Sequence, residues 1–258
     1  MQENDGHPSF VSLLANLPAA SVERGKGKLH GSTVAVLRNL IVTGALAPGT
    51  RLNERELCEQ LAVSRTPIRE AIKTLMQDGL LHASPNHSAI VSELDATEVE
   101  ALIDVLMVIE GLAGELAARH VDDVSIAEIG VLHYQMVLHH SRNELPAYFA
   151  ANKAFHRKIV ELSRNPILIW IWDLLALRVD RARYSSNRWP VRWKTAIQEH
   201  QQILDALTAR DANLTASQMR DHVKSGLSGL VELLKAESVS TSTDNAQRHN
   251  PSDVKRKA

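Results

Sequence analysis

The sequence predicts a mainly α-helical protein in which a winged helix-turn-helix is followed by an antiparallel, all-helical bundle. The length of 258 residues suffices for two domains of ordinary size. Between Leu29 and Ser92, three short helical patterns precede two short strand-like segments that are separated by turn residues. After about residue 95, apolar residues recur with the period of a helix and show very little of the alternation that is typical of strands.

These changes along the chain define four segments. Residues 1–28 mix glycine, proline, serine and charged residues without a sustained period, which predicts a flexible arm. Residues 29–92 form the predicted winged helix-turn-helix, and residues 93–236 form the predicted helical domain. Residues 237–258 contain no leucine, isoleucine or aromatic residue, so they cannot bury a core and are predicted to be a disordered tail.

The winged helix-turn-helix begins with a helix, because apolar residues recur at helical spacing from Val34 to Ile41 before Gly44 ends the pattern. A second, short helix is predicted after Asn53. Asn53 and Glu56 have the spacing of a capping box, with asparagine in place of the usual serine or threonine.

The third helix is predicted to start at Ser64, which is a favourable N-cap residue, and to end at Gly79. Its apolar face has the spacing i, i+3, i+4 and i+7 and consists of Ile68, Ala71, Ile72 and Leu75. Two short strands, Leu80–Ala83 and Ala89–Ser92, then form the hairpin of the wing.

The second domain is predicted to consist of helices throughout. Its first helix has one long apolar face that extends from Leu102 to Leu116. Further helices fit residues 122–142, 144–163, 166–185, 192–209 and 212–235, with boundaries at Pro146, Pro166, Pro190 and Asp211. Helices of this length, joined by short connections, predict an antiparallel bundle.

The composition excludes several classes of protein. The chain has 29 lysines and arginines and 30 aspartates and glutamates, so its overall charge gives no indication of nucleic-acid binding. One cysteine excludes an internal disulfide framework and favours a reducing compartment. No apolar run approaches the ~18 residues of a membrane span, and the polar, acidic N-terminus argues against a secretory signal. We therefore expect a cytoplasmic protein without membrane contact.

One face of the third helix carries candidate DNA contacts. Arg65, Arg69 and Lys73 are spaced i, i+4 and i+8, opposite the apolar face. Ser64 and Thr66 lie in the first turn, where free backbone N–H groups and the helix dipole favour a phosphate. An arginine at this end of a helix can pair with guanine in the major groove. On spacing alone, a solvated charged face fits the pattern about equally well.

Aromatic residues are distributed unevenly between the two domains. Nine of the ten lie between Tyr134 and Trp193, and residues 29–92 contain none. Proteins that bind single strands stack bases on aromatic side chains, which the first domain lacks. Double-stranded DNA is therefore the expected partner.

Two stretches of the first domain resemble a known family. Residues 46–57 (LAPGTRLNEREL) and 63–71 (VSRTPIREA) are strongly similar to the GntR family of bacterial transcriptional regulators. The resemblance covers about 60 residues and implies that Arg55, Ser64, Arg65, Thr66 and Arg69 contact DNA while the wing tip reaches the minor groove. The family usually has Arg-Gly at the wing tip, where this chain has His87-Ser88. His87 remains a candidate contact to a phosphate or to the minor groove.

The second domain resembles the FCD effector-binding domain of the FadR-type branch of this family. The similarity rests on residues 152–156 (NKAFH), 163–166 (SRNP), 199–207 (EHQQILDAL) and 219–222 (MRDH). It implies that Asn152, His156, His200 and His222 bind a divalent metal ion inside the bundle. Neutral imidazoles suit zinc, nickel and related ions. On spacing alone, three unrelated histidines are the favoured interpretation.

The effector is predicted to be a small carboxylate. Three histidines and an amide, where the family more often has aspartate at position 152, leave the charge of the metal ion uncompensated and attract an anion. Arg178 is a candidate carboxylate clamp, and a surface arginine is an equally good interpretation. The arginine that the family often places three residues before the glutamate of the first bundle helix is Met107 here.

Together these features predict a homodimeric transcription factor that binds a palindromic operator and is switched by a carboxylate effector at a metal-containing pocket. Two alternatives stay open at this point. One is a metal-dependent hydrolase or lyase that uses His156, His200 and His222 around an activated water. The other is a bundle that the metal ion only stabilises.

Overall fold

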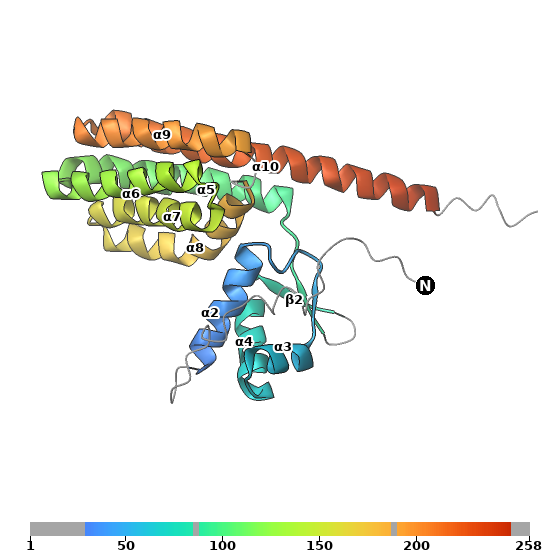
Figure 1. Cartoon of the computed structure of the whole chain (residues 1–258). Coiled ribbons are helices and arrows are strands. Elements are labelled where there is room, and N and C mark those ends of the chain that lie inside the picture. Colours follow the sequence, from blue (N-terminus) through green and yellow to red (C-terminus); the bar gives the residue numbers. More distant parts are fainter. Residues whose placement is uncertain (1–28, 85–87, 187–189, 249–258) are drawn as a thin grey trace, which may run out of the picture. The chain divides into compact units, whose positions relative to one another are not determined.

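The computed structural model describes residues 29–84, 88–186 and 190–248 (Figure 1). The chain divides into two compact units, Met1–Glu93 and Leu94–Ala258. The predicted arm at residues 1–28, the candidate contact His87 and the end of the chain at residues 249–258 lie outside the described residues.

The first unit has the predicted helix-turn-helix. Its described helices are α2 (Leu29–Val42), α3 (Glu54–Leu61) and α4 (Arg65–Gln77). The side chain of Asn53 caps α3, because its oxygen accepts a hydrogen bond from the backbone N–H of Arg55 at 3.0 Å and its amide donates to Glu56 at 2.8 Å. Ala62 ends α3 in the left-handed conformation, with φ 50°, and so makes the tight turn that leads into α4.

The wing of the first unit is a three-stranded sheet rather than the predicted two-stranded hairpin. Strands β2 (Leu81–Ala83) and β3 (Ala89–Val91) pair antiparallel, and β1 (Arg51–Leu52) pairs with the other edge of β3. The backbone of Val91 also exchanges hydrogen bonds with Gly49 and Thr50. A strand of two residues is too short to show alternation, so the sequence pattern could not reveal it.

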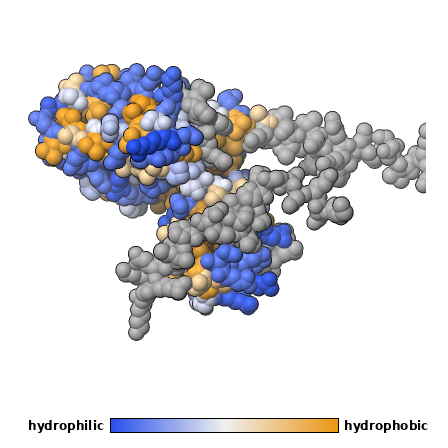
Figure 2. All heavy atoms as spheres, in the orientation of Figure 1, coloured by the Kyte–Doolittle hydropathy of each residue, from blue (hydrophilic) through white to orange (hydrophobic). Residues whose placement is uncertain are grey.

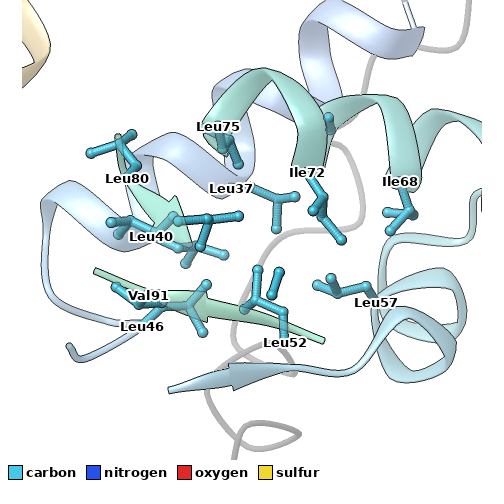
Figure 3. Packing of buried hydrophobic residues seen from close by; sticks show 14 of the residues in the cluster. Leu37, Leu40, Leu46, Leu52, Leu57, Ile68, Ile72, Leu75, Leu80 and Val91 are labelled. Carbon is cyan, nitrogen blue, oxygen red and sulfur yellow. The ribbon is translucent and has the colours of Figure 1, made fainter. Parts of the chain in front are cut away.

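The core of the first unit lies between the helices and the sheet. Leu37 of α2, Leu57 of α3 and Ile68 of α4 are completely buried, as is Val91 of β3. Figure 3 shows these side chains pointing toward one another from the four elements. The apolar residues of α4 that were predicted to be buried therefore hold this helix in the core. The opposite face of α4 can carry polar residues.

The second unit is an antiparallel helical bundle, as predicted. Its helices are α5 (Ala96–His120), α6 (Asp123–Ser141), α7 (Leu145–Leu162), α8 (Pro166–Ser186), α9 (Pro190–Thr208) and α10 (Ala212–Arg248). Asp95, Asp122 and Asp211 cap the starts of α5, α6 and α10 with their side-chain oxygens. Among the described helices, none is long and apolar enough to cross a membrane.

Helix α10 continues further than the sequence predicts. We expected disorder from residue 237, but the helix extends to Arg248 and Figure 1 shows it continuing beyond its neighbours in the bundle. The lack of leucine, isoleucine and aromatic residues after Leu234 limits burial but does not prevent helix formation. Neither glycine nor proline occurs between Gly229 and Pro251, so no strong helix breaker ends a helix that is already formed.

Helices α5 and α10 pack closely because α5 has glycines where side chains of α10 need space. A Cβ atom at Gly111 would lie 2.8 Å from Cγ of Arg220. A Cβ atom at Gly114 would lie 2.8 Å from Cγ of Met219 and 3.3 Å from the carbonyl oxygen of Thr215. The two 2.8 Å distances are too short for carbon atoms, so a side chain at either position of α5 would force Arg220 or Met219 of α10 to shift.

We predict opposite effects for two glycine-to-alanine substitutions in this bundle. Gly114→Ala should lower the free energy of unfolding by about 1–3 kcal/mol through overpacking against α10. Gly130→Ala in α6 should raise it by up to about 1 kcal/mol, because nothing lies within 4 Å of the new Cβ atom and alanine favours a helix. Urea unfolding followed by tryptophan fluorescence measures both, and a shift of equal sign in the two variants would contradict the packing described here.

Candidate metal centre and DNA-binding surface

Three histidines from three helices meet inside the bundle. His156 lies on α7, His200 on α9 and His222 on α10, and one ring nitrogen of each lies within 4.8 Å of the others. His156 and His200 are completely buried, and His222 is 5% exposed. The three predicted histidine ligands are therefore brought together from positions 44 and 22 residues apart in the sequence.

The buried carboxylate of Glu110 contacts the Nδ1 side of the His156 ring. Oε2 of Glu110, on α5, lies 3.2 Å from Nδ1 of His156 and accepts a 2.6 Å hydrogen bond from Arg183 of α8. Its other oxygen accepts a 3.0 Å hydrogen bond from the indole N–H of Trp172. This charge contact favours a proton on Nδ1 of His156 and leaves Nε2 as the nitrogen that faces the other histidines.

A second carboxylate holds His222 in the same way. Oε2 of Glu199 lies 2.7 Å from Nδ1 of His222 and 2.7 Å from Nη2 of Arg192, and its Oε1 accepts a 2.7 Å hydrogen bond from Ser225. Nε2 of His222 is thereby turned inward as well. Nδ1 of His156 and Nδ1 of His200 are both buried without a hydrogen-bond partner among the described residues, and His200 differs in that no carboxylate contacts it there.

The electrostatic environment keeps the histidines neutral and the glutamates ionised. Burial, together with the charges of neighbouring groups, lowers the pKa of all three histidines, most strongly that of His200. Burial alone would raise the pKa of Glu199, but hydrogen bonds from His222 and Arg192 outweigh it and lower the pKa to about 2. Arg183 and His156 likewise hold the pKa of Glu110 well below its ordinary value, against the effect of burial. Neutral imidazole is the form that binds metal ions.

The distance between His156 and His200 fits two ligands of one divalent metal ion. Nε2 of His156 lies 3.3 Å from Nε2 of His200. Two nitrogens that are each about 2.0–2.1 Å from a tetrahedral zinc ion lie about 3.3 Å from each other. Two of the three rings also have the carboxylate partners that orient metal-binding histidines.

Asn152, the fourth predicted ligand, lies one turn before His156 on α7 and is 2% exposed. It lines a small cavity next to the histidines together with His222, Ser186 and the arginines Arg183 and Arg192. Its amide therefore lies at the border between the histidine cluster and the cavity.

Arg178, the predicted carboxylate clamp, does not line this cavity. It is exposed on α8, and its Nε lies 3.1 Å from Glu98 of α5. On a helix, residues five positions apart point in different directions, and Arg183 rather than Arg178 has the inward orientation. The alternative of a surface arginine is thus the correct one.

Four residues of the site were not predicted from the sequence as site residues: Glu110, Arg183, Arg192 and Glu199. Glu110 had a detectable signal, because a glutamate at the i+4 position after Leu106 interrupts an apolar helix face. The arginines had none, since most arginines in helices are exposed. A further buried histidine, His133, does not belong to the cluster. It is buried in the middle of α6, and its Nε2 lies 3.2 Å from the carbonyl oxygen of Ile197.

In the first unit, the predicted DNA-contacting residues lie on an exposed surface. Arg55, Ser64, Arg65, Thr66, Arg69 and Lys73 are all exposed. Ser64 occupies the N-cap position of α4 as predicted, but its hydroxyl makes no capping hydrogen bond, so it remains available to a phosphate.

Acidic neighbours pair with most of these cations. Arg69 lies 2.9 Å from Glu54 of α3, Lys73 lies 2.9 Å from Glu70, and Arg55 lies 3.5 Å from Glu59. No ion pair of Arg65 is found among the described residues. Arg65 is therefore the cation of this set that needs no rearrangement before it can bind a phosphate or a base.

Comparison with known proteins agrees with this architecture. Residues 30–91 match the family of bacterial regulatory proteins called gntR, and residues 101–225 match the FCD domain. An HTH-type transcriptional regulator in an unstable DNA locus of Streptomyces ambofaciens is 31% identical over 192 residues, which cover 73% of this chain and 79% of the relative. The chain belongs to the gntR family.

Further relatives of this gntR chain are regulators too. The repressor RspR of Escherichia coli is 27% identical and covers 73% of this chain, with 83% of its own length matched. The probable repressor of the D-xylose utilization operon of Paenarthrobacter nicotinovorans is 29% identical over 71% of this chain and 80% of its own. The chain is accordingly a DNA-binding transcriptional regulator and not a metal-dependent enzyme.

Solved structures show the same fold. The structure of McbR/YncC of Escherichia coli matches 81% of this chain and 98% of its own with a TM-score of 0.68 at 22% identity. A GntR regulator of Rhodococcus sp. RHA1 matches 80% of this chain and 97% of its own with a TM-score of 0.64 at 20% identity.

We predict that the metal-free bundle loses stability as the pH falls below about 6.5. The unfolded chain takes up protons on these histidines near pH 6.5, whereas the folded bundle excludes them, so the stability is fully present above that pH and declines below it. Each histidine contributes a slope of up to about 1.4 kcal/mol per pH unit. Urea unfolding between pH 7 and 5 with a chelator, followed by tryptophan fluorescence, measures the slope because Trp170, Trp172 and Trp193 lie in helices of the bundle.

The variant His200→Gln tests the origin of this slope. It should reduce the slope by up to about 1.4 kcal/mol per pH unit, because it removes one group that only the unfolded chain protonates. An unchanged slope in this variant would contradict the neutral, buried state of His200.

Proposed function

We propose that this regulator is a homodimer that binds a palindromic operator and is switched by a small carboxylate at a divalent metal ion in the bundle. The observation that carries the proposal is the convergence of three buried, neutral histidines beside a cavity that Arg183 and Arg192 line. Asn152, His156, His200 and His222 would hold the ion, and zinc or nickel suits this donor set. The ion would supply positive charge for a carboxylate, in a protein that we expect to act in the cytoplasm.

Helix α4 would read the operator from the major groove. Arg65 lies in its first turn, where an arginine can reach a guanine, and Ser64 and Thr66 have hydroxyls near the backbone N–H groups that favour a phosphate. Arg55, Arg69 and Lys73 would contact phosphates once they leave their acidic partners. His87 remains a predicted wing contact.

Dimerisation is supported by an exposed apolar face of the bundle. Val105, Val108 and Leu112 of α5 are exposed at spacing i, i+3 and i+7, and α8 repeats this spacing with Ile167, Trp170 and Leu174. The two helices are neighbours, since Glu110 of α5 bonds to Trp172 and Arg183 of α8. Figure 2 shows exposed apolar residues among hydrophilic ones on the bundle. A second copy of the chain would cover such a face and give the twofold symmetry of a palindromic operator.

The first test measures operator affinity with and without the effector. With Zn²⁺ or Ni²⁺ bound, a carboxylate that binds the bundle should change the affinity for operator DNA at least tenfold, and by linkage DNA should change the affinity for the carboxylate by the same factor. His200→Ala should abolish this response and retain DNA binding. A response that persists in His200→Ala would separate the switch from the metal centre. A fold that melts on chelation and responds to no carboxylate would favour a purely structural ion.

The second test separates base recognition from phosphate contact. Arg65→Ala should weaken operator binding by about 1–3 kcal/mol and relax sequence preference, because it removes a base contact. Lys73→Ala should weaken operator and scrambled DNA alike and lower the salt dependence by about one ion per subunit. Fluorescence anisotropy over a range of salt concentrations gives both quantities, with Arg178→Ala in the bundle as the control. Equal loss of sequence preference in both variants would contradict these roles.

A further inference from the structure

Arg192 is a cation with unused hydrogen-bonding capacity inside the bundle. Its side chain is 12% exposed, and its Nη2 donates a 2.7 Å hydrogen bond to Glu199. Its Nε and Nη1 atoms are buried and have no hydrogen-bond partner among the described residues. Buried donors of a charged group are costly to leave unpaired, so the Arg192 guanidinium is suited to an additional acceptor.

The polar residues that line the cavity next to Arg192 are hydrogen-bond donors and cations. Asn152, Ser186, His222, Arg183 and Arg192 supply its polar lining, and the lining residues include no carboxylate. The two carboxylates of the site lie behind these residues, where Glu110 bonds to Arg183 and Glu199 bonds to Arg192. An acceptor that enters the cavity would therefore meet donors without meeting a negative charge.

The cavity is small and has room beside the arginine only because position 226 is a glycine. A Cβ atom there would lie 3.0 Å from Nη2 of Arg192. The hydroxyl of Ser186 donates to the carbonyl oxygen of Gly226 and fixes the backbone at this point. Gly226 therefore lets the Arg192 guanidinium lie against the backbone at the edge of this cavity.

The balance of charges indicates how many negative charges an effector should carry. Glu110 and Glu199 are matched by Arg183 and Arg192, and Asn152 and the three histidines are neutral. With a divalent ion bound, the centre has two uncompensated positive charges. A monocarboxylate would neutralise half of this charge, whereas a dianion would neutralise all of it.

We propose that Arg192 selects a two-headed effector of the short dicarboxylate class, with one carboxylate at the metal centre and the second on the free N–H groups of Arg192. This inference rests on the proposed metal-dependent function and specifies its ligand. A short chain is expected because Nη2 of Arg192 and Nδ1 of His222 bond to the same oxygen of Glu199, each at 2.7 Å, so the arginine is a direct neighbour of the histidine cluster.

The experiment compares acids that differ in one carboxylate. Calorimetry on the full-length, Zn²⁺-loaded protein measures binding of malonate and succinate against propionate and butyrate, which have the same chain lengths and one carboxylate fewer. We expect the dicarboxylates to bind at least tenfold more tightly. Arg192→Gln should reduce that preference to less than threefold.

Two further variants keep the test interpretable. Arg192→Lys retains the charge next to Glu199 but loses the planar fork, so it should fold normally and bind the dicarboxylates with intermediate affinity. Arg178→Ala, which removes an exposed arginine of α8 outside the cavity, should leave all affinities unchanged. Thermal unfolding of each Zn²⁺-loaded variant confirms that it is folded.

The outcomes separate this inference from the function on which it rests. Monocarboxylates and dicarboxylates that bind equally to the original protein would overturn the role of Arg192 while leaving the carboxylate switch intact. A dicarboxylate preference that survives in Arg192→Gln would also overturn it. Loss of binding of every acid in His200→Ala, with the preference lost in Arg192→Gln, would support both. Binding of no acid to the Zn²⁺-loaded original protein would overturn both.

Discussion

The carboxylate of Glu110 is the interaction on which the rest of the bundle interior depends. It is completely buried on α5 and accepts hydrogen bonds from Trp172 and Arg183 of α8 while it faces His156 of α7. A buried charge is tolerated only where partners compensate it, and removing one partner of such a pair typically costs about 3–5 kcal/mol. One side chain thus determines the relative position of three helices and the orientation of the first histidine.

The same constraint operates a second time at Glu199. Its partners Arg192 and His222 come from α9 and α10, so the two carboxylates together orient two of the three histidines, His156 and His222. The charge of each glutamate is neutralised by an arginine, and each glutamate also orients the ring of a histidine. The cluster is therefore oriented without becoming negative, and this explains how a site with two buried glutamates can still attract an anion when a metal ion is present.

Elements whose signal is local in the sequence could be predicted, and elements whose signal arises from assembly could not. The N-cap at Asn53 and the apolar spacing of α4 lie within a few residues, and both predictions are confirmed. Glu56 accepts from the side-chain amide of Asn53, not from its backbone N–H as in a capping box. The two-residue strand β1 exists only because β3 offers it a partner, and Arg192 lies at the cavity only because α9 places it over Gly226. The spacing of the histidines did not predict the cluster, because residues 44 positions apart show no periodic relation to each other. Only the family resemblance predicted it.

The same pattern of charge pairing occurs in both units of the chain. The net charge of −1 does not reveal the cations that could bind an anion, because most of them have an acidic neighbour. In the first unit, Arg69 and Lys73 are paired, and Arg65 has no ion pair among the described residues. In the bundle, Arg192 is paired through one nitrogen and has two others available. Pairing thus fixes Arg69 and Lys73 on α4 and Arg183 at the cavity, and it leaves Arg65 and Arg192 with free donors. A free donor on a fixed scaffold is what recognition of an anion requires, whether the anion is a nucleic acid or a carboxylate.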